Sequence, residues 1–87
     1  LLNMTRDEIL DLAKQLINGD RNADYGEASK NFDDIAQIWG VVLNRPVTRK
    51  EVALCMAGVK MARLAKSPDH EDSWVDLCGY GALGGEF

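Results

Sequence analysis

Apolar residues recur every three to four positions along nearly the whole chain, which is the spacing of an amphipathic helix. Four segments carry this pattern, at about residues 6–18, 28–44, 49–66 and 68–83. Polar stretches with glycine or proline separate them, and no segment shows the strict alternation of a half-buried strand. The pattern therefore predicts an all-α fold, a compact bundle of four helices.

Capping residues support the boundaries of these segments. Thr5 and Glu8 form a capping box before the first helix, and Thr48 and Glu51 form another before the third. Ser67-Pro68 is read as a cap followed by proline at the first position of the fourth helix. Because so few residues join the last two helices, we expect them to form an antiparallel hairpin.

The apolar positions also predict which side chains form the core. The helix at 49–66 is apolar nearly all round, so we expect it to be the central one. Trp39, Val42, Leu43 and Trp74 all lie at core positions of their helices. Glycines near the end of the last helix are expected to loosen it, namely Gly79, Gly81, Gly84 and Gly85.

The length of 87 residues allows one hydrophobic core, so residues 1–87 are predicted to form a single all-α domain. Residues 1–3 and 86–87 are interpreted as additions from a vector. Cys55 and Cys78 are too few for a disulfide scaffold, and we read both as buried, reduced residues of a cytoplasmic protein.

The net charge of −4 argues against generic nucleic-acid binding, which depends on many Lys and Arg contacts to phosphates. The chain also lacks the apolar run of about 20 residues that a membrane-spanning helix needs. We therefore expect neither nucleic acid in general nor a membrane as a partner.

Polar side chains concentrate where the last two helices should face each other. Reflection about the turn near Ser67 places Arg63 opposite Asp72 and Lys60 close to Asp76. Tyr80 follows the two aspartates at helical spacing, on the same face. In one interpretation these charges form salt bridges that fix the register of the helices.

The functional interpretation of the same cluster is a binding site. Lys60 and Arg63 would face phosphate, while Asp72 and Asp76 would hold Mg²⁺ or orient basic groups. The two aspartates would be the catalytic residues if the protein were hydrolytic. The sequence does not decide between the site and the structural seam.

Other candidate ligand-binding residues lie outside this seam. In the polar loop at 18–26, Arg21 could clamp a phosphate and Tyr25 could stack on a base. Asn31 is a candidate polar contact from the second helix. His70, at the start of the fourth helix, is read either as a cap or hydrogen-bonding residue or as a ligand.

These residues resemble a small all-helical family of tailed phages and prophages that has no known function. The matching motifs cover about residues 9–83 and comprise Asn18-Gly19-Asp20-Arg21, Asp24-Tyr25-Gly26, Asn31-Phe32, Trp39, Lys60-Met61-Ala62-Arg63, Ser67-Pro68, His70, Asp72-Ser73, Asp76 and Gly79-Tyr80. This resemblance implies a phage source and a helical fold, with the host cytoplasm as location.

A more distant resemblance is to the MazG-type all-α nucleoside triphosphate pyrophosphohydrolases, which hold Mg²⁺ with two acidic helix motifs. Asp72 and Asp76 are similar to the second motif. The first motif is missing, because Asp33 and Asp34 are adjacent rather than one turn apart, and Glu27 lies at the start of its helix.

Three functions follow as hypotheses. The first is binding, with or without sequestration, of a nucleotide or another phosphorylated small molecule. The second is Mg²⁺-dependent pyrophosphohydrolysis, and the third is inhibition of a host or defence protein through protein–protein contact. Since helix 49–66 carries more apolar surface than one small chain hides easily, we also expect a homo-oligomer.

Overall fold

The computed structural model describes residues 3–19 and 27–87, and within them it contains helices and no strand. The helices are α1 (Arg6–Asn18), α3 (Ala28–Leu43), α4 (Arg49–Lys66) and α5 (Glu71–Glu86). The predicted all-α fold with four helices is therefore confirmed. None of the described helices is both long and apolar enough to cross a bilayer.

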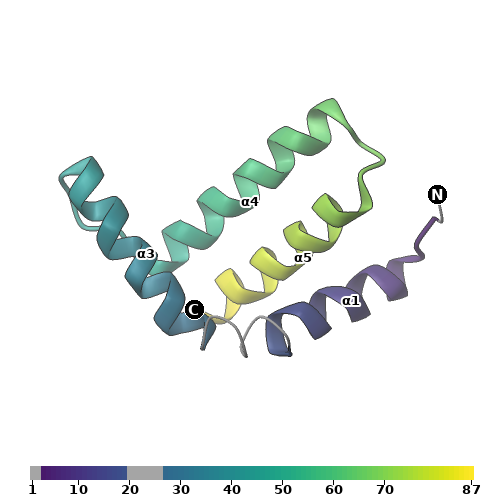
Figure 1. Ribbon diagram of the computed structural model, residues 1–87, viewed down its shortest axis with the longest axis horizontal. Coiled ribbons are helices and arrows are strands. Elements are labelled where there is room, and N and C mark those ends of the chain that lie inside the picture. The colour runs from purple at the N-terminus through teal and green to yellow at the C-terminus, as the bar shows by residue number, and fades with distance from the viewer. Residues whose placement is uncertain (1–2, 20–26) are drawn as a thin grey trace.

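Helix α5 lies between α4 and α1, while α3 packs across the start of α4 at the edge of the molecule (Figure 1). Helices α4 and α5 run antiparallel side by side, as the short connection predicted. The expectation that α4 is the central helix is wrong, because α4 has one face open to solvent. That face includes exposed Leu54, Val59, Met61 and also Cys55, which was expected to be buried.

Helix α5 begins at Glu71 instead of residue 68. Ser67 ends α4, because its peptide N–H donates to the carbonyl oxygen of Arg63 at 2.8 Å. The peptide N–H of His70 then donates to the carbonyl oxygen of Ser67 at 3.1 Å and closes a turn around Pro68. The serine therefore caps the preceding helix at its end, and His70 is the N-cap residue of α5.

Helix α5 also continues to Glu86, so the prediction that its glycines loosen its end is wrong. A Cβ atom at Gly84 would lie 3.1 Å from the Cβ atom of Ala53 on α4. A Cβ atom at Gly79 would lie 3.2 Å from a methyl carbon of Ile17 on α1. These two glycines let α5 approach both neighbours closely, and the packing outweighs the entropic cost of glycine in a helix.

The hydrophobic core joins α3, α4 and α5. The ring centroid of Phe32 lies 5.2 Å from that of Phe87 and 6.3 Å from that of Tyr80. Trp39 packs against this cluster from α3, as predicted. The buried members of the cluster are Phe32, Ala36, Val52, Ala53, Tyr80 and Leu83.

Three predicted core residues are exposed instead. Trp74 is 42% exposed, and its indole N–H donates to the carbonyl oxygen of Pro68 at 2.7 Å. Val42 and Leu43 are 75% and 58% exposed. Both buried residues of α3 lie in its first nine positions, so the core covers the beginning of this helix and leaves Val42 and Leu43 at its end exposed.

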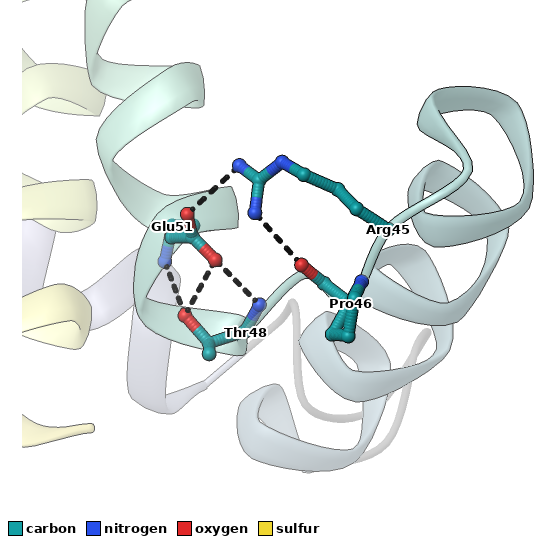
Figure 2. Close-up of polar contacts among 4 residues, drawn as sticks. All are labelled: Arg45, Pro46, Thr48 and Glu51. Carbon is teal, nitrogen blue, oxygen red and sulfur yellow. Dashed lines mark hydrogen bonds and ion pairs between the residues drawn. The ribbon is translucent and has the colours of Figure 1, made fainter.

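Both predicted capping boxes form, and Figure 2 shows the one that begins α4. The carboxylate of Glu51 accepts the peptide N–H of Thr48 at 3.0 Å, and the Thr48 hydroxyl accepts the peptide N–H of Glu51 at 3.1 Å. The guanidinium of Arg45 donates to the same carboxylate at 3.1 Å and to the carbonyl oxygen of Pro46 at 2.8 Å. The hydrogen bond from the Thr48 N–H lowers the pKa of Glu51 below its usual value, and the hydrogen bond from Arg45 adds a smaller lowering.

This lowered pKa predicts a contribution of Glu51 to acid sensitivity. The carboxylate stabilises the fold above its unfolded-state pKa near 4.5, and that contribution is lost as the pH falls through the lower folded-state pKa. Glu51→Gln should therefore be less stable than the wild type at pH 7, with a difference that shrinks toward pH 3. Urea unfolding at several pH values measures this difference, and a constant difference would contradict the assignment.

Candidate functional site

Lys60 and Asp76 form the ion pair that the hairpin register predicted. The Lys60 ammonium nitrogen lies 2.8 Å from a carboxylate oxygen of Asp76. The Lys60 side chain is only 13% exposed, whereas that of Asp76 is 36% exposed. A lysine covered to this degree needs its anionic partner, so this contact has the geometry of the structural seam.

The other predicted members of the seam lie elsewhere. Arg63 and Asp72 are both exposed, and within residues 3–19 and 27–87 no ion pair joins them. Tyr80 is buried in the core, only 8% exposed, with its ring tilted against that of Phe32. The four charges and the phenol therefore do not form a single site.

The two aspartates do not fit a resident Mg²⁺. Asp76 is already held by Lys60, and Asp72 lies one turn earlier on α5 in an exposed position. In the described part of the chain, no group of three or more His, Cys, Asp and Glu side chains could hold a metal ion. Asp33 accepts hydrogen bonds from Nε and Nη2 of the Arg49 guanidinium group at 2.9 and 2.8 Å.

A groove at the junction of α4 and α5 brings basic side chains together. It has a volume of about 670 Å³ and is lined by Val59, Ala62, Arg63, Lys66, Ser67 and His70. None of these six residues is acidic. Two of them, Arg63 and His70, were predicted ligand-binding residues, although the sequence did not predict that they share a surface.

Each basic residue of the groove reaches it for a local reason. Arg63 and Lys66 stand one turn apart at the end of α4, where positive charge also complements the helix dipole. His70 is placed by the turn that precedes α5, and its Nδ1 lies 2.8 Å from the hydroxyl oxygen of Ser73. This contact orients the imidazole ring at the edge of the groove.

Val59 and Ala62 give the groove an apolar floor, and Val59 remains 45% exposed. Lys66 and Val59 were not predicted as site residues. The helical spacing of Lys66 from Arg63 is the one sequence signal that could have indicated Lys66. Val59 belongs to the apolar pattern of residues 49–66, which gave no sign that it would line a groove.

The remaining candidate residues lie away from this groove. Asn31 is half-buried on α3 and does not line the groove. Arg21 and Tyr25 lie outside the described residues. Arg49, which the sequence analysis did not single out, joins α4 to Asp33 of α3 and lies 5.6 Å from the ring centroid of Phe87. Asp33 is thus part of a contact between α3 and α4.

A second, smaller cavity lies between α1 and α5. It has a volume of about 250 Å³, and its lining is apolar apart from Asp76 and the hydroxyl group of Tyr80. The lining residues are Ala13, Leu16, Ile17, Val75, Asp76, Gly79, Tyr80 and Leu83. No cation lines it, so it lacks the groups that would recognise phosphate.

The Lys60–Asp76 contact predicts a loss of stability in a Lys60→Ala variant. Removal of the ammonium leaves the half-covered carboxylate without its partner, so the free energy of unfolding should fall by about 1–2 kcal/mol. Urea unfolding measures this fall. The double variant Lys60→Met with Asp76→Leu should recover part of it. Wild-type stability in Lys60→Ala would show that the contact contributes nothing.

Comparison with known proteins gives a family and related phage proteins. Residues 8–87 match the model of a family described as "Domain of unknown function (DUF6378)". The chain is 40% identical over 77 residues to the Gene 55 protein of Mycobacterium phage L5, across 86% of this chain and 49% of that protein. It is 38% identical over 74 residues to the Gene 55 protein of Mycobacterium phage D29, across 85% and 49%. The chain thus spans about half the length of these curated relatives.

These relatives bear out the resemblance to a phage family of unknown function, and they carry no statement about a ligand or a reaction. No solved structure matches the chain. The resemblance to MazG-type enzymes has no support among these comparisons and stays a prediction.

Proposed function

Since this chain belongs to the DUF6378 family, whose description assigns no activity, we propose a function from its own groove. The protein binds a nucleotide or a similar phosphorylated small molecule where α4 ends and α5 begins. It is phage-encoded, acts in the host cytoplasm, and holds its ligand without turning it over. The observation that carries this proposal is a groove that combines three basic side chains with an apolar floor.

The basic residues of the groove match the chemistry of phosphate. The planar guanidinium of Arg63 offers two parallel donors to phosphate oxygens, and the ammonium of Lys66 adds a second positive charge. His70 lies at the same groove, and its imidazole ring carries an N–H group that can donate to a phosphate oxygen. Because no carboxylate lines the groove, an anionic ligand meets no like charge there.

The apolar floor matches the other part of a nucleotide. Val59 and Ala62 offer a surface on which a purine or pyrimidine ring can lie. The groove volume of about 670 Å³ is within the range of small-molecule sites, roughly 300–1,000 Å³. A charged rim with an apolar floor favours a ligand that has both phosphate groups and a ring.

This proposal changes the residues that the sequence predicted for phosphate. Arg63 and His70 keep their role, and Lys66 takes the place of Lys60, which is paired with Asp76. Asn31 and Tyr80 have no place in the groove. Mg²⁺-dependent hydrolysis would need a metal at Asp72 and Asp76, and the ion pair of Asp76 with Lys60 does not favour that alternative.

Isothermal titration calorimetry with adenosine, AMP, ADP and ATP tests the proposal. We expect affinity to rise with the number of phosphates and to fall between 50 and 200 mM salt, because the contacts to phosphate are ionic. Binding should not require Mg²⁺, and no phosphate or pyrophosphate should be released. The proposal would be overturned if adenosine bound as tightly as ATP. It would also be overturned if none of the nucleotides in a panel that covers every base bound at all.

A further inference from the structure

The outer face of α3 exposes a group of apolar side chains near the end of the helix. Ile38 is 63% exposed, Val41 83% and Val42 75%. Helix α3 lies at the edge of the molecule, with its end directed away from α5 (Figure 1). We call Ile38, Val41 and Val42 the α3 ridge.

The α3 ridge has the geometry of a helix-packing surface. Its members are spaced at i, i+3 and i+4, so they form a single stripe along the helix. The core side of α3 is on the opposite side, where Phe32 and Ala36 are only 3% and 4% exposed. The helix is therefore apolar on two sides near its end, although the bundle covers only one of them.

The charge distribution shows which partner this ridge suits. Residues 35–44 contain no charged residue, although the whole chain carries a net charge of −4. In a two-fold symmetric contact, a residue near the axis meets its own copy, so a charge there would repel itself. An uncharged segment is the part of an acidic chain that can pair with a second copy without this repulsion.

The area of the patch also suits a dimer. The α3 ridge exposes on the order of 400 Å² of apolar surface, which is within the size range of the main patch of a typical monomer, and such a patch is often functional. Pairing two copies would cover at most about 800 Å² from these side chains alone. Neighbouring exposed residues such as Gln37 would bring the contact toward the roughly 1,200 Å² at which stable interfaces begin.

We propose that α3 packs antiparallel against α3 of a second copy of this chain, across a two-fold axis near Gly40 and Val41. In this register Ile38 of one copy lies opposite Val42 of the other. The antiparallel arrangement also aligns the two helix dipoles favourably. The contact is separate from the groove at the junction of α4 and α5, so the dimer does not depend on the proposed ligand.

Sedimentation velocity of the chain at 5–200 µM tests this proposal. The wild type should sediment as a dimer at the higher concentrations, and Val41→Asp should sediment as a monomer throughout. Leu54→Asp is the matched control, because Leu54 is 69% exposed on α4 and lies outside the α3 ridge. It adds the same charge and should leave the dimer intact.

Circular dichroism checks that each variant is folded. Because Val41 is 83% exposed, we expect its substitution to leave the fold intact. If Val41→Asp fails to fold, Val42→Lys replaces it as the test of the α3 ridge. A monomeric wild type at 200 µM would overturn the proposal. A partner other than a second copy of this chain would then have to cover the ridge. A dimer that persists in Val41→Asp but is lost in Leu54→Asp would overturn the proposal as well.

Discussion

Phe32→Ala should lower the free energy of unfolding by about 3–5 kcal/mol, the largest stability change that a single truncation is expected to cause in this chain. Phe32 is 3% exposed, and its ring packs against the rings of Tyr80 on α5 and of Phe87, the residue that follows α5. Its removal opens a cavity where α3 meets the rest of the bundle. A domain of this size has little stability beyond that amount, so much of the variant should be unfolded at 37 °C.

Urea unfolding followed by circular dichroism measures this loss at one fixed protein concentration. Leu10→Ala is the matched control, since Leu10 is 57% exposed on α1 and its truncation should change stability by less than about 0.5 kcal/mol. A loss below 1 kcal/mol for Phe32→Ala would mean that α3 is not held by the described core.

Arg63→Glu should weaken ATP binding by roughly ten- to a hundredfold, which is the largest functional change that we expect. The substitution removes a charge-assisted hydrogen bond worth about 1.5–3 kcal/mol and adds repulsion between the new carboxylate and the phosphates. Arg63 is exposed, so its replacement should leave the melting temperature nearly unchanged. Calorimetric titration with ATP measures the change in affinity.

Lys30→Glu controls for the change in net charge. Lys30 is 72% exposed on α3 and pairs with Asp34 of the same helix, at 2.6 Å. This variant makes the same change in total charge away from the groove, and its affinity for ATP should fall less than threefold. Equal losses in the two variants would show that binding responds to net charge instead of to the groove.

The sequence predicted the helices well because their signals are local. Thr5 with Glu8, and Thr48 with Glu51, satisfy backbone groups three residues away, and both boxes form as predicted. The register of the hairpin was also predictable, since a short connection places Lys60 beside Asp76. These inferences needed no knowledge of how distant parts of the chain meet.

The predictions that failed depended on tertiary packing. Gly79 and Gly84 look like helix-loosening residues in isolation, but each lies where a neighbouring helix approaches too closely for a side chain. Val42 and Trp74 have the spacing of core residues, yet they are 75% and 42% exposed. Periodicity shows that a helix has an apolar face, and it does not show whether one chain buries that face.

The candidate site was predictable only in part for the same reason. The predicted cluster of bases and acids does not form one site in the structure, because the sequence could not separate the paired Lys60 from the exposed Arg63. That separation depends on how deep each side chain lies between α4 and α5. Lys66 joins Arg63 and His70 through the shape of the turn at Ser67, which local patterns predicted differently.

Titration of ¹⁵N-labelled protein with ATP, followed by two-dimensional NMR, tests the central claim most directly. The account predicts that amide shifts change most at the end of α4 and the start of α5, around Arg63, Lys66 and His70. Amides of the cavity between α1 and α5, such as that of Ala13, should change little. Shifts that are absent at saturating ATP, or that are largest around Ala13, would contradict the claim that the groove binds phosphorylated ligands.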